Sequence, residues 1–356
     1  MKVFRNWFLA AAALIIAGSM MLAACAPGGS GTGSGAAEEQ AAGAASEDPA
    51  EDTVSEEGIP ALHVDGTHLA DKAGNPVQLR GISTHGIGWF PQYVNQECIH
   101  WFKETFGINV LRIAMYTAEN GGYCIDGDKE ALKAIVDKGV QICEEEGIYA
   151  IIDWHILRDG RPQANQPEAE KFFDEMSKKY GDKTHVLYEI CNEPNGDYAS
   201  WPKIKEYAED IIPIIRKNDP DAVIICGTPS WSKLCYAPEK FPLEDPNVMY
   251  TMHFYAATNK ETNRKDMQKA LDAGLPVFVT EFGIVESNGD EAPDTAEGDA
   301  WMELCDKNNI SYVMWNLSNK DESCAFIKPD VDKTSGFTLD DLSESALWYY
   351  HHLTGK

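Results

Sequence analysis

The sequence predicts an α/β fold, a (β/α)8 TIM barrel. Eight apolar, β-branched runs occur from residue 77 onward, and stretches with helical periodicity separate them. Continuous apolar strands that alternate with amphipathic helices indicate parallel strands buried on both faces. Eight such units in roughly 300 residues match a barrel of this kind, whose usual length is about 250 residues.

The eight expected strands are read directly from the apolar runs. They cover residues 77–83, 109–116, 148–155, 186–193, 222–228, 247–256, 276–283 and 311–318. The clearest helix between them spans 128–147, because its apolar residues share one face: Leu132, Ile135, Val136, Val140 and Cys143. Gly147 is suited to end that helix. An open doubly wound sheet is the alternative, but no glycine-rich phosphate loop follows the first strand.

The first 24 residues have the pattern of an export signal. Lys2 and Arg5 precede an apolar run from Trp7 to Ala24. A retained membrane anchor is the alternative, since about 18 apolar residues can just span a bilayer. Gly18 and Ser19 within the run weaken that alternative.

The end of this run resembles a bacterial lipobox, Leu22-Ala23-Ala24-Cys25. The resemblance implies that Cys25 is lipidated, so we expect an exported cell-surface lipoprotein, anchored to the bacterial membrane, or a secreted protein. Residues 25–58 are mainly Gly, Ala, Ser and acidic residues, a composition that predicts a disordered tether. We expect residues 59–356 to form a single (β/α)8 domain.

The charge limits the class of partner. The chain has 57 acidic residues against 30 Lys and Arg, a formal charge of −27. Such a surface repels polyanions, which argues against nucleic acid and against direct binding to anionic lipid. We therefore expect contact with a membrane only through the lipid anchor, and neutral or cationic partners remain open.

The cysteines predict neither a metal site nor a redox motif. Eight follow Cys25, at positions 98, 124, 143, 191, 226, 235, 305 and 324, without zinc-type or CxxC spacing. An exported protein can form disulfides, but several of these cysteines lie within apolar periodic segments. We expect mostly free, buried thiols and no metal.

Polar and aromatic residues stand at the ends of six predicted strands. They are Arg112, Asp153-Trp154-His155, Asn192-Glu193-Pro194, His253 with Tyr255, Thr280-Glu281, and Trp315-Asn316. Each has an ordinary structural explanation when it is taken alone. Together they predict a site at the carboxyl end of the barrel, where enzymes of this fold assemble their active sites.

Two of these residues are carboxylates that would face each other across the barrel mouth, Glu193 and Glu281. Glycoside hydrolysis needs such a pair, one to protonate the leaving oxygen and one to meet the anomeric carbon. Phosphoryl transfer usually needs a metal, and acyl transfer needs an activated nucleophile, but no GxSxG motif occurs. The pattern favours a glycosidase.

The motifs Asn192-Glu193-Pro194 and Thr280-Glu281-Phe282-Gly283 resemble glycoside hydrolase family 5, and within it the bacterial endo-β-1,4-glucanases. The residues that carry the resemblance with them are Arg112, His155, His253, Tyr255 and Trp315, supported by the stretches 80–86 and 315–323. The resemblance extends over residues 60–353. No cofactor is implied.

The resemblance also implies roles. Glu193 would be the general acid/base and Glu281 the nucleophile of a retaining reaction, with carboxyl groups about 5–5.5 Å apart. Arg112 and Tyr255 would hold Glu281, and Asn192 would bind the sugar 2-hydroxyl. His155 and His253 would line the cleft, where they hold hydroxyls or tune Glu193.

Other residues are expected to bind sugar. Trp89, Trp231 and Trp315 lie in or after strand-end loops, where they can stack on sugar rings, whereas Trp101 and Trp301 are expected in the core. Lys320 and Glu322 resemble the family's sugar contacts, and a solvated ion pair is their alternative. His85 belongs to the supporting stretch 80–86 and is also expected to bind or support the substrate.

The expected substrate is a β-glucan polysaccharide or oligosaccharide, cleaved by a monomer. A β-mannanase or xyloglucanase on the same barrel is the alternative, and the loop 156–160 lacks the acidic run that could indicate subsite preference. A surface lipoprotein that binds oligosaccharide without cleaving it is a third hypothesis. Two facing carboxylates argue against it, since a pure binder has no use for them.

Overall fold

The computed structural model describes residues 58–356. The expected signal peptide, Cys25 and nearly all of the tether lie outside this part of the chain. Within residues 58–356, no helix combines the length and the hydropathy needed to cross a membrane.

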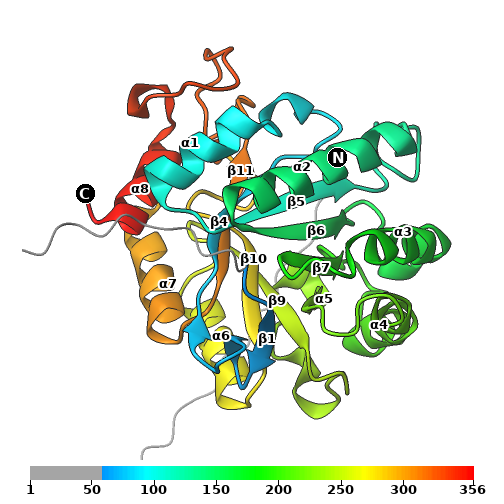
Figure 1. Cartoon of the computed structure of the whole chain (residues 1–356). Coiled ribbons are helices and arrows are strands. Elements are labelled where there is room, and N and C mark those ends of the chain that lie inside the picture. Colours follow the sequence, from blue (N-terminus) through cyan, green and yellow to red (C-terminus); the bar gives the residue numbers. More distant parts are fainter. Residues whose placement is uncertain (1–57) are drawn as a thin grey trace, which may run out of the picture. The chain divides into compact units, whose positions relative to one another are not determined.

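Eight parallel strands form a closed barrel, which confirms the predicted (β/α)8 fold (Figure 1). They are β4 (Arg80–Thr84), β5 (Val110–Tyr116), β6 (Tyr149–His155), β7 (Val186–Cys191), β8 (Ile224–Cys226), β9 (Val248–Tyr255), β10 (Val277–Gly283) and β11 (Tyr312–Leu317). Each strand pairs with the next along the chain, and β11 pairs with β4 to close the ring. The carboxyl ends of all eight strands therefore open on the same side.

Helices follow the strands and surround the barrel (Figure 1). They are α1 (Gln96–Phe106), α2 (Lys129–Glu146), α3 (Gln166–Tyr180), α4 (Trp201–Arg216), α5 (Pro229–Ser232), α6 (Glu261–Asp272), α7 (Thr295–Lys307) and α8 (Glu344–Thr354). Short 3-10 turns lie at Pro91–Tyr93, Pro162–Asn165, Ala237–Lys240 and Leu339–Asp341. Except for the four-residue α5, the apolar faces of the α-helices pack on the outer faces of the strands in one large core.

Helix α2 begins and ends as its sequence predicts. The Asp128 side chain accepts hydrogen bonds from the backbone N–H groups of Glu130 and Ala131, which satisfies two donors of the first turn. Gly147 takes a left-handed conformation at the end, with a φ of 68°, and its N–H bonds back to Cys143 and Glu144.

The prediction that the first barrel strand starts at residue 77 is wrong. Val77 belongs to a separate antiparallel sheet of β1 (Leu62–Asp65), β2 (His68–Asp71) and β3 (Pro76–Val77). This sheet places Leu62 and Leu69 against residues that lie near the starts of the barrel strands, such as Val110 and Met249. Burial of that apolar end explains why the hairpin forms, and it closes the amino end of the barrel.

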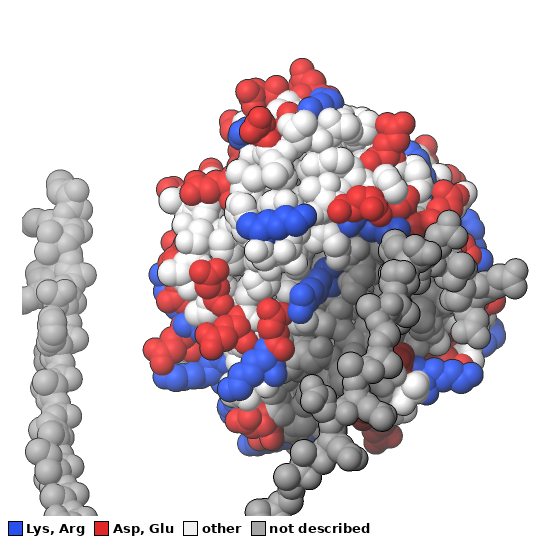
Figure 2. Space-filling model, turned by 60° about the vertical axis from the view of Figure 1, so that its left-hand side comes forward, with Lys and Arg blue, Asp and Glu red and all other residues white. Residues whose placement is uncertain are grey.

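All eight cysteines of the described residues are free, and seven are buried. The surface charge of residues 58–356 shows no site for a polyanion on the face in Figure 2. On that face, basic side chains are scattered among acidic ones and are not gathered into one patch.

We predict that Leu69→Ala lowers the free energy of unfolding by about 2–5 kcal/mol, because it leaves a cavity in the closed end of the barrel. Urea denaturation followed by tryptophan fluorescence measures this change. The matched control is Leu339→Ala, since Leu339 is exposed and its truncation should change stability by about 0.5 kcal/mol or less. Equal effects of the two substitutions would contradict the role given to β1–β3.

Candidate active site

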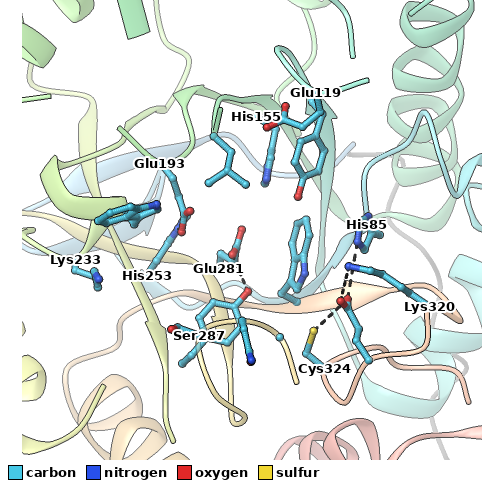
Figure 3. A pocket seen from close by; sticks show the side chains of 18 of the residues that line it. His85, Glu119, His155, Glu193, Lys233, His253, Glu281, Ser287, Lys320 and Cys324 are labelled. Carbon is cyan, nitrogen blue, oxygen red and sulfur yellow. Dashed lines mark hydrogen bonds and ion pairs between the residues drawn. The ribbon is translucent and has the colours of Figure 1, made fainter. Parts of the chain in front are cut away.

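A cavity of about 560 Å³ opens at the carboxyl end of the barrel (Figure 3). Eleven of the thirteen side chains that the sequence predicts for sugar binding or catalysis line it: His85, Trp89, His155, Glu193, Trp231, His253, Tyr255, Glu281, Trp315, Lys320 and Glu322. The other two, Arg112 and Asn192, are fully buried directly beneath the cavity. The structure thus gathers side chains from all eight barrel strands and the loops that follow them.

Arg112 is the centre of the buried layer. Its guanidinium bonds to three carboxylates, with Nε 2.7 Å from Glu189, Nη2 3.0 Å from Asp153 and Nη1 3.2 Å from Glu281. Nη2 also donates to Asn192 Oδ1 at 2.7 Å. One buried cation therefore balances part of a concentrated negative charge and fixes the directions of four side chains.

Glu281 is held by donors at both carboxylate oxygens. Tyr255 donates its hydroxyl proton to Oε1 at 2.9 Å, and Arg112 donates to Oε2. Burial raises the pKa of Glu281 and nearby Glu193 adds to that effect, whereas His253 and Arg112 oppose it. The two donors favour the charged form, which suits a group that must act as an anion.

Glu193 has a different environment. It follows strand β7, and its Oε1 lies 2.9 Å from Nδ1 of His253. Burial raises the pKa of Glu193 from 4.5 to about 8, against the opposing charges of Arg112 and Lys233. Glu193 therefore keeps a proton near neutral pH, which suits a general acid.

The ring of His155 has a defined proton position. Asn192 must direct its amide N toward His155 Nε2, 3.2 Å away, because its oxygen accepts from Arg112. His155 then carries its proton on Nδ1 and donates it to Asp153, 2.6 Å away. Because the two amide protons of Asn192 point to His155 and to the carbonyl of Ile156, its predicted contact with a sugar 2-hydroxyl stays a prediction.

The predicted aromatic residues differ in exposure. Trp315 is nearly buried on the cavity floor, stacked on His155 with centroids 5.2 Å apart, whereas Trp89 and Trp231 are about two-fifths exposed. Trp231 projects from a turn in which three residues in a row, 230–232, have left-handed φ of 53–64°. Such a turn is strained, and the Ser232 hydroxyl holds it by donating to the Asn192 carbonyl at 2.6 Å.

His85 and Lys320 lie together on one side of the cavity (Figure 3). Glu322 lies between them, because one of its oxygens is 3.9 Å from Nε2 of His85 and the other bonds to Lys320. Lys320 and Glu322 form the ion pair that the sequence left as an alternative, at 2.5 Å. Glu322 is nearly buried, so the pair is built into the wall and is more than a solvated contact. On the other side of the cavity, Lys233 lies 5.0 Å from the ring centroid of Trp231.

The sequence analysis assigned no role to three residues of the site. Asp153 and Thr280 were part of the strand-end motifs and Glu189 was not, yet all three are completely buried in the hydrogen-bonded layer. Glu189 was detectable, since a charged residue inside an apolar strand needs a buried partner. The cavity wall also includes Tyr116, Glu119, Leu157, Lys233, Asn259, Ser287, Asn288, Gly289 and Cys324. These lie in strand ends and loops whose sequence carried no motif.

Glu193, His253 and Glu281 each offer one ligand atom within 4.8 Å of the others. Nδ1 of His253 and Oε1 of Glu193 already share a hydrogen bond. Glu281 has donors at both oxygens. These contacts fit proton transfer and carboxylate chemistry better than the binding of a cation, and the two glutamates lie close enough to act on the two atoms of one substrate bond.

Known proteins resemble this chain along most of its length. The cellulase family, glycosyl hydrolase family 5, matches residues 70–321. Endoglucanase A of Butyrivibrio fibrisolvens is 47% identical over 290 residues, which cover 81% of this chain and 67% of that protein. Endoglucanase A of Evansella cellulosilytica is 44% identical over 274 residues, 76% of this chain and 55% of that protein.

A solved structure shows the same architecture. It is the catalytic domain of Thermobifida fusca endoglucanase Cel5A in complex with cellotetraose. The TM-score is 0.79 at 36% identity, over 83% of this chain and 97% of that one. This chain therefore shares the fold of that catalytic domain, and it spans only 55–67% of the length of the two endoglucanases above.

We predict that Glu193→Gln makes stability less dependent on pH. Wild-type Glu193 holds a proton in the folded state up to about pH 8, whereas the unfolded chain releases it near 4.5. The contribution of Glu193 to the free energy of unfolding is therefore complete at low pH. It is lost as pH rises toward 8, at up to about 1.4 kcal/mol per pH unit. From pH 5 to pH 8, the free energy of unfolding of wild type should therefore fall by about 1 kcal/mol or more beyond any fall in the variant.

Urea denaturation at the two pH values measures this difference. The matched control is Glu303→Gln at an exposed position of α7, which should follow wild type at both pH values. A Glu193→Gln variant that loses as much stability as wild type between pH 5 and pH 8 would contradict the buried, protonated state of Glu193.

Proposed function

Because the chain belongs to glycosyl hydrolase family 5, the cellulase family, we propose that it is a retaining endo-β-1,4-glucanase. It would hydrolyse cellulose and related β-glucans by double displacement, with Glu193 as acid/base and Glu281 as nucleophile.

The separation of the two carboxylates is the observation that carries this proposal. One oxygen of Glu193 and one of Glu281 lie within 4.8 Å of each other. Retaining glycosidases place their carboxyl groups about 5–5.5 Å apart, whereas inverting enzymes need about 6.5–9.5 Å to admit a water molecule. The short separation supports direct attack by a carboxylate on the anomeric carbon.

In the first step of the proposed reaction, Glu281 attacks the anomeric carbon while Glu193 gives its proton to the departing glycosidic oxygen. The aglycone leaves, and the sugar remains bound to Glu281 through an ester. In the second step the ionised Glu193 takes a proton from water, which attacks the same carbon and releases Glu281. The raised pKa of Glu193 suits it to both steps, since it regains a proton readily.

The shape of the cavity supports cleavage inside a chain. His85 and Lys320 lie on one side of the cavity, and Lys233 lies beside Glu193 on the other (Figure 3). Trp89 packs against His85 with ring centroids 5.7 Å apart, and the Trp231 ring lies 5.0 Å from Lys233. Sugar rings can therefore bind on both sides of the carboxylates, with flat aromatic faces beneath them. The similar Thermobifida fusca structure with cellotetraose agrees with an extended β-glucan ligand. The whole cleft comes from one chain, so we propose that the protein acts as a monomer.

We also propose that the protein is a lipoprotein, exported and held at the bacterial membrane through Cys25. The basic start, the apolar run and the sequence Leu22-Ala23-Ala24-Cys25 support this proposal. An acidic barrel of this kind would not bind anionic lipid by itself, so the lipid would provide the attachment.

We predict that the purified protein releases reducing sugar from carboxymethylcellulose and barley β-glucan faster than from mannan. Glu281→Gln should lower kcat by roughly 10³-fold or more, because a neutral amide cannot form the ester intermediate. Proton NMR of cello-oligosaccharide hydrolysis should show the β-anomer first, since two inversions retain configuration.

Glu303→Gln serves as the charge-matched control and should keep wild-type rates, because Glu303 is exposed on α7. Faster release of reducing sugar from mannan would show that the protein is a mannanase and contradict the proposed glucanase activity. Initial formation of the α-anomer would overturn the double displacement and leave the substrate class standing.

We predict that expression in a lipoprotein-forming bacterium gives a membrane-bound product that incorporates an alkyne fatty acid, whereas Cys25→Ala abolishes the labelling. Activity per mole should be equal for both forms, since Cys25 lies outside the domain that holds the site. A wild-type protein without label would refute the anchor.

A further inference from the structure

A chain of hydrogen bonds leads from Glu193 down into the buried layer. Glu193 Oε1 lies 2.9 Å from His253 Nδ1, and His253 Nε2 lies 2.9 Å from the hydroxyl of Thr280. That hydroxyl is 2.7 Å from Glu189 Oε1. His253, Thr280 and Glu189 are each at most 1% exposed, so bulk water cannot replace any of these contacts.

The direction of each hydrogen bond follows from its innermost member. Both oxygens of Glu189 face donors, because Oε2 accepts from Arg112 Nε at 2.7 Å and Oε1 meets Thr280. An ionised carboxylate can only accept, so the Thr280 hydroxyl must donate to it. Burial raises the pKa of Glu189, and the adjacent Arg112 opposes this and stabilises its anion.

The proton position on His253 is then determined. The single hydroxyl proton of Thr280 is used on Glu189, so Thr280 can only accept from His253, which must carry its proton on Nε2. The unprotonated Nδ1 faces Glu193. A hydrogen bond at 2.9 Å therefore requires the proton to come from the Glu193 carboxyl group.

We propose that Thr280 and Glu189 are positioning residues that hold His253 in its Nε2–H form and thereby favour the protonated state of Glu193. With this form of the ring, ionised Glu193 faces a lone pair, whereas protonated Glu193 has an acceptor. The opposite tautomer would donate to the anion and stabilise it. The proposal rests on the proposed role of Glu193 as acid/base.

Other charged groups around Glu193 and His253 also affect the protonation states of these two residues. Arg112 and Lys233 favour the ionised form of Glu193, and Glu189 and Asp153 disfavour it. Glu281 faces His253 from β10 and favours a charged imidazole, but burial is stronger and lowers the pKa of His253 to about 4. His253 is therefore neutral at pH 5–8, and its tautomer is the variable that the two positioning residues control.

The same relay connects the two proposed catalytic carboxylates. Arg112 bonds to Glu189 through Nε and to Glu281 through Nη1. Glu281 and His253 are also paired neighbours on β10 and β9. The ionised state of one glutamate and the protonated state of the other thus depend on one buried arrangement.

The test uses Thr280→Val, which removes the hydroxyl and keeps the branched shape. Nitrogen-15 NMR of histidine-labelled protein, with His253 assigned by comparison with His253→Gln, should show the Nε2–H form in wild type at pH 6. In Thr280→Val the ring should change to the Nδ1–H form, which donates to Glu193. The upper pH limit of kcat/KM should then fall by about one unit, since a hydrogen bond to the anion lowers the pKa of a carboxyl group.

Thr251→Val is the matched control. Thr251 is a buried threonine on β9 whose hydroxyl has no hydrogen-bond partner among the described residues. Its replacement should leave the His253 tautomer and the pH profile unchanged. Thr280→Ser keeps a hydroxyl and should restore the wild-type tautomer, so a merely structural effect at residue 280 is separated from the relay.

The outcomes separate this proposal from the proposed function. A wild-type ring in the Nδ1–H or doubly protonated form overturns the relay, whatever the substrate. An unchanged tautomer and pH profile in Thr280→Val overturn it as well. If the protein cleaves no β-glucan while the tautomer changes as expected, the relay stands and the proposed function fails.

Discussion

The buried positive charge of Arg112 is the constraint on which the site depends. It stands within hydrogen-bond or ion-pair distance of Asp153, Glu189 and Glu281, and no solvent reaches it. Removing one partner of a buried ion pair typically costs about 3–5 kcal/mol, because the remaining charge loses its compensation. Arg112 therefore allows several carboxylates to be buried under one cavity, and a barrel is rigid enough to hold them there.

The two glutamates are chemically alike and differ in their surroundings. Glu281 receives protons from Tyr255 and Arg112, which favours its anion. Glu193 faces a neutral His253, which favours its acid form. Such a difference is what a reaction with one nucleophile and one proton donor requires. The cost is a free energy of unfolding that falls between about pH 4.5 and pH 8, because the unfolded chain releases the Glu193 proton in that range while the folded chain keeps it.

Local patterns were enough to predict most of the fold. The apolar run 149–152 begins a strand in which every residue is buried, as is typical of a central parallel strand. The hairpin at 62–77 was not predicted because its strands are short and its apolar residues few. Leu69 becomes significant only when the open end of the barrel is present to cover it. Strand ends were also overestimated, since Asn192 and Glu193 follow β7 and do not belong to it.

The sequence by itself determined the barrel, the carboxyl-end position of the polar motifs and the presence of two glutamates, because alternation and strand order depend only on neighbouring residues. The tertiary structure alone decided how these groups act on one another. Thr280 and Glu189 are 91 positions apart in the chain, and their contact exists only because β7 and β10 belong to one closed ring. Proton positions depend on such distances and on burial, and neither is a property of a short segment.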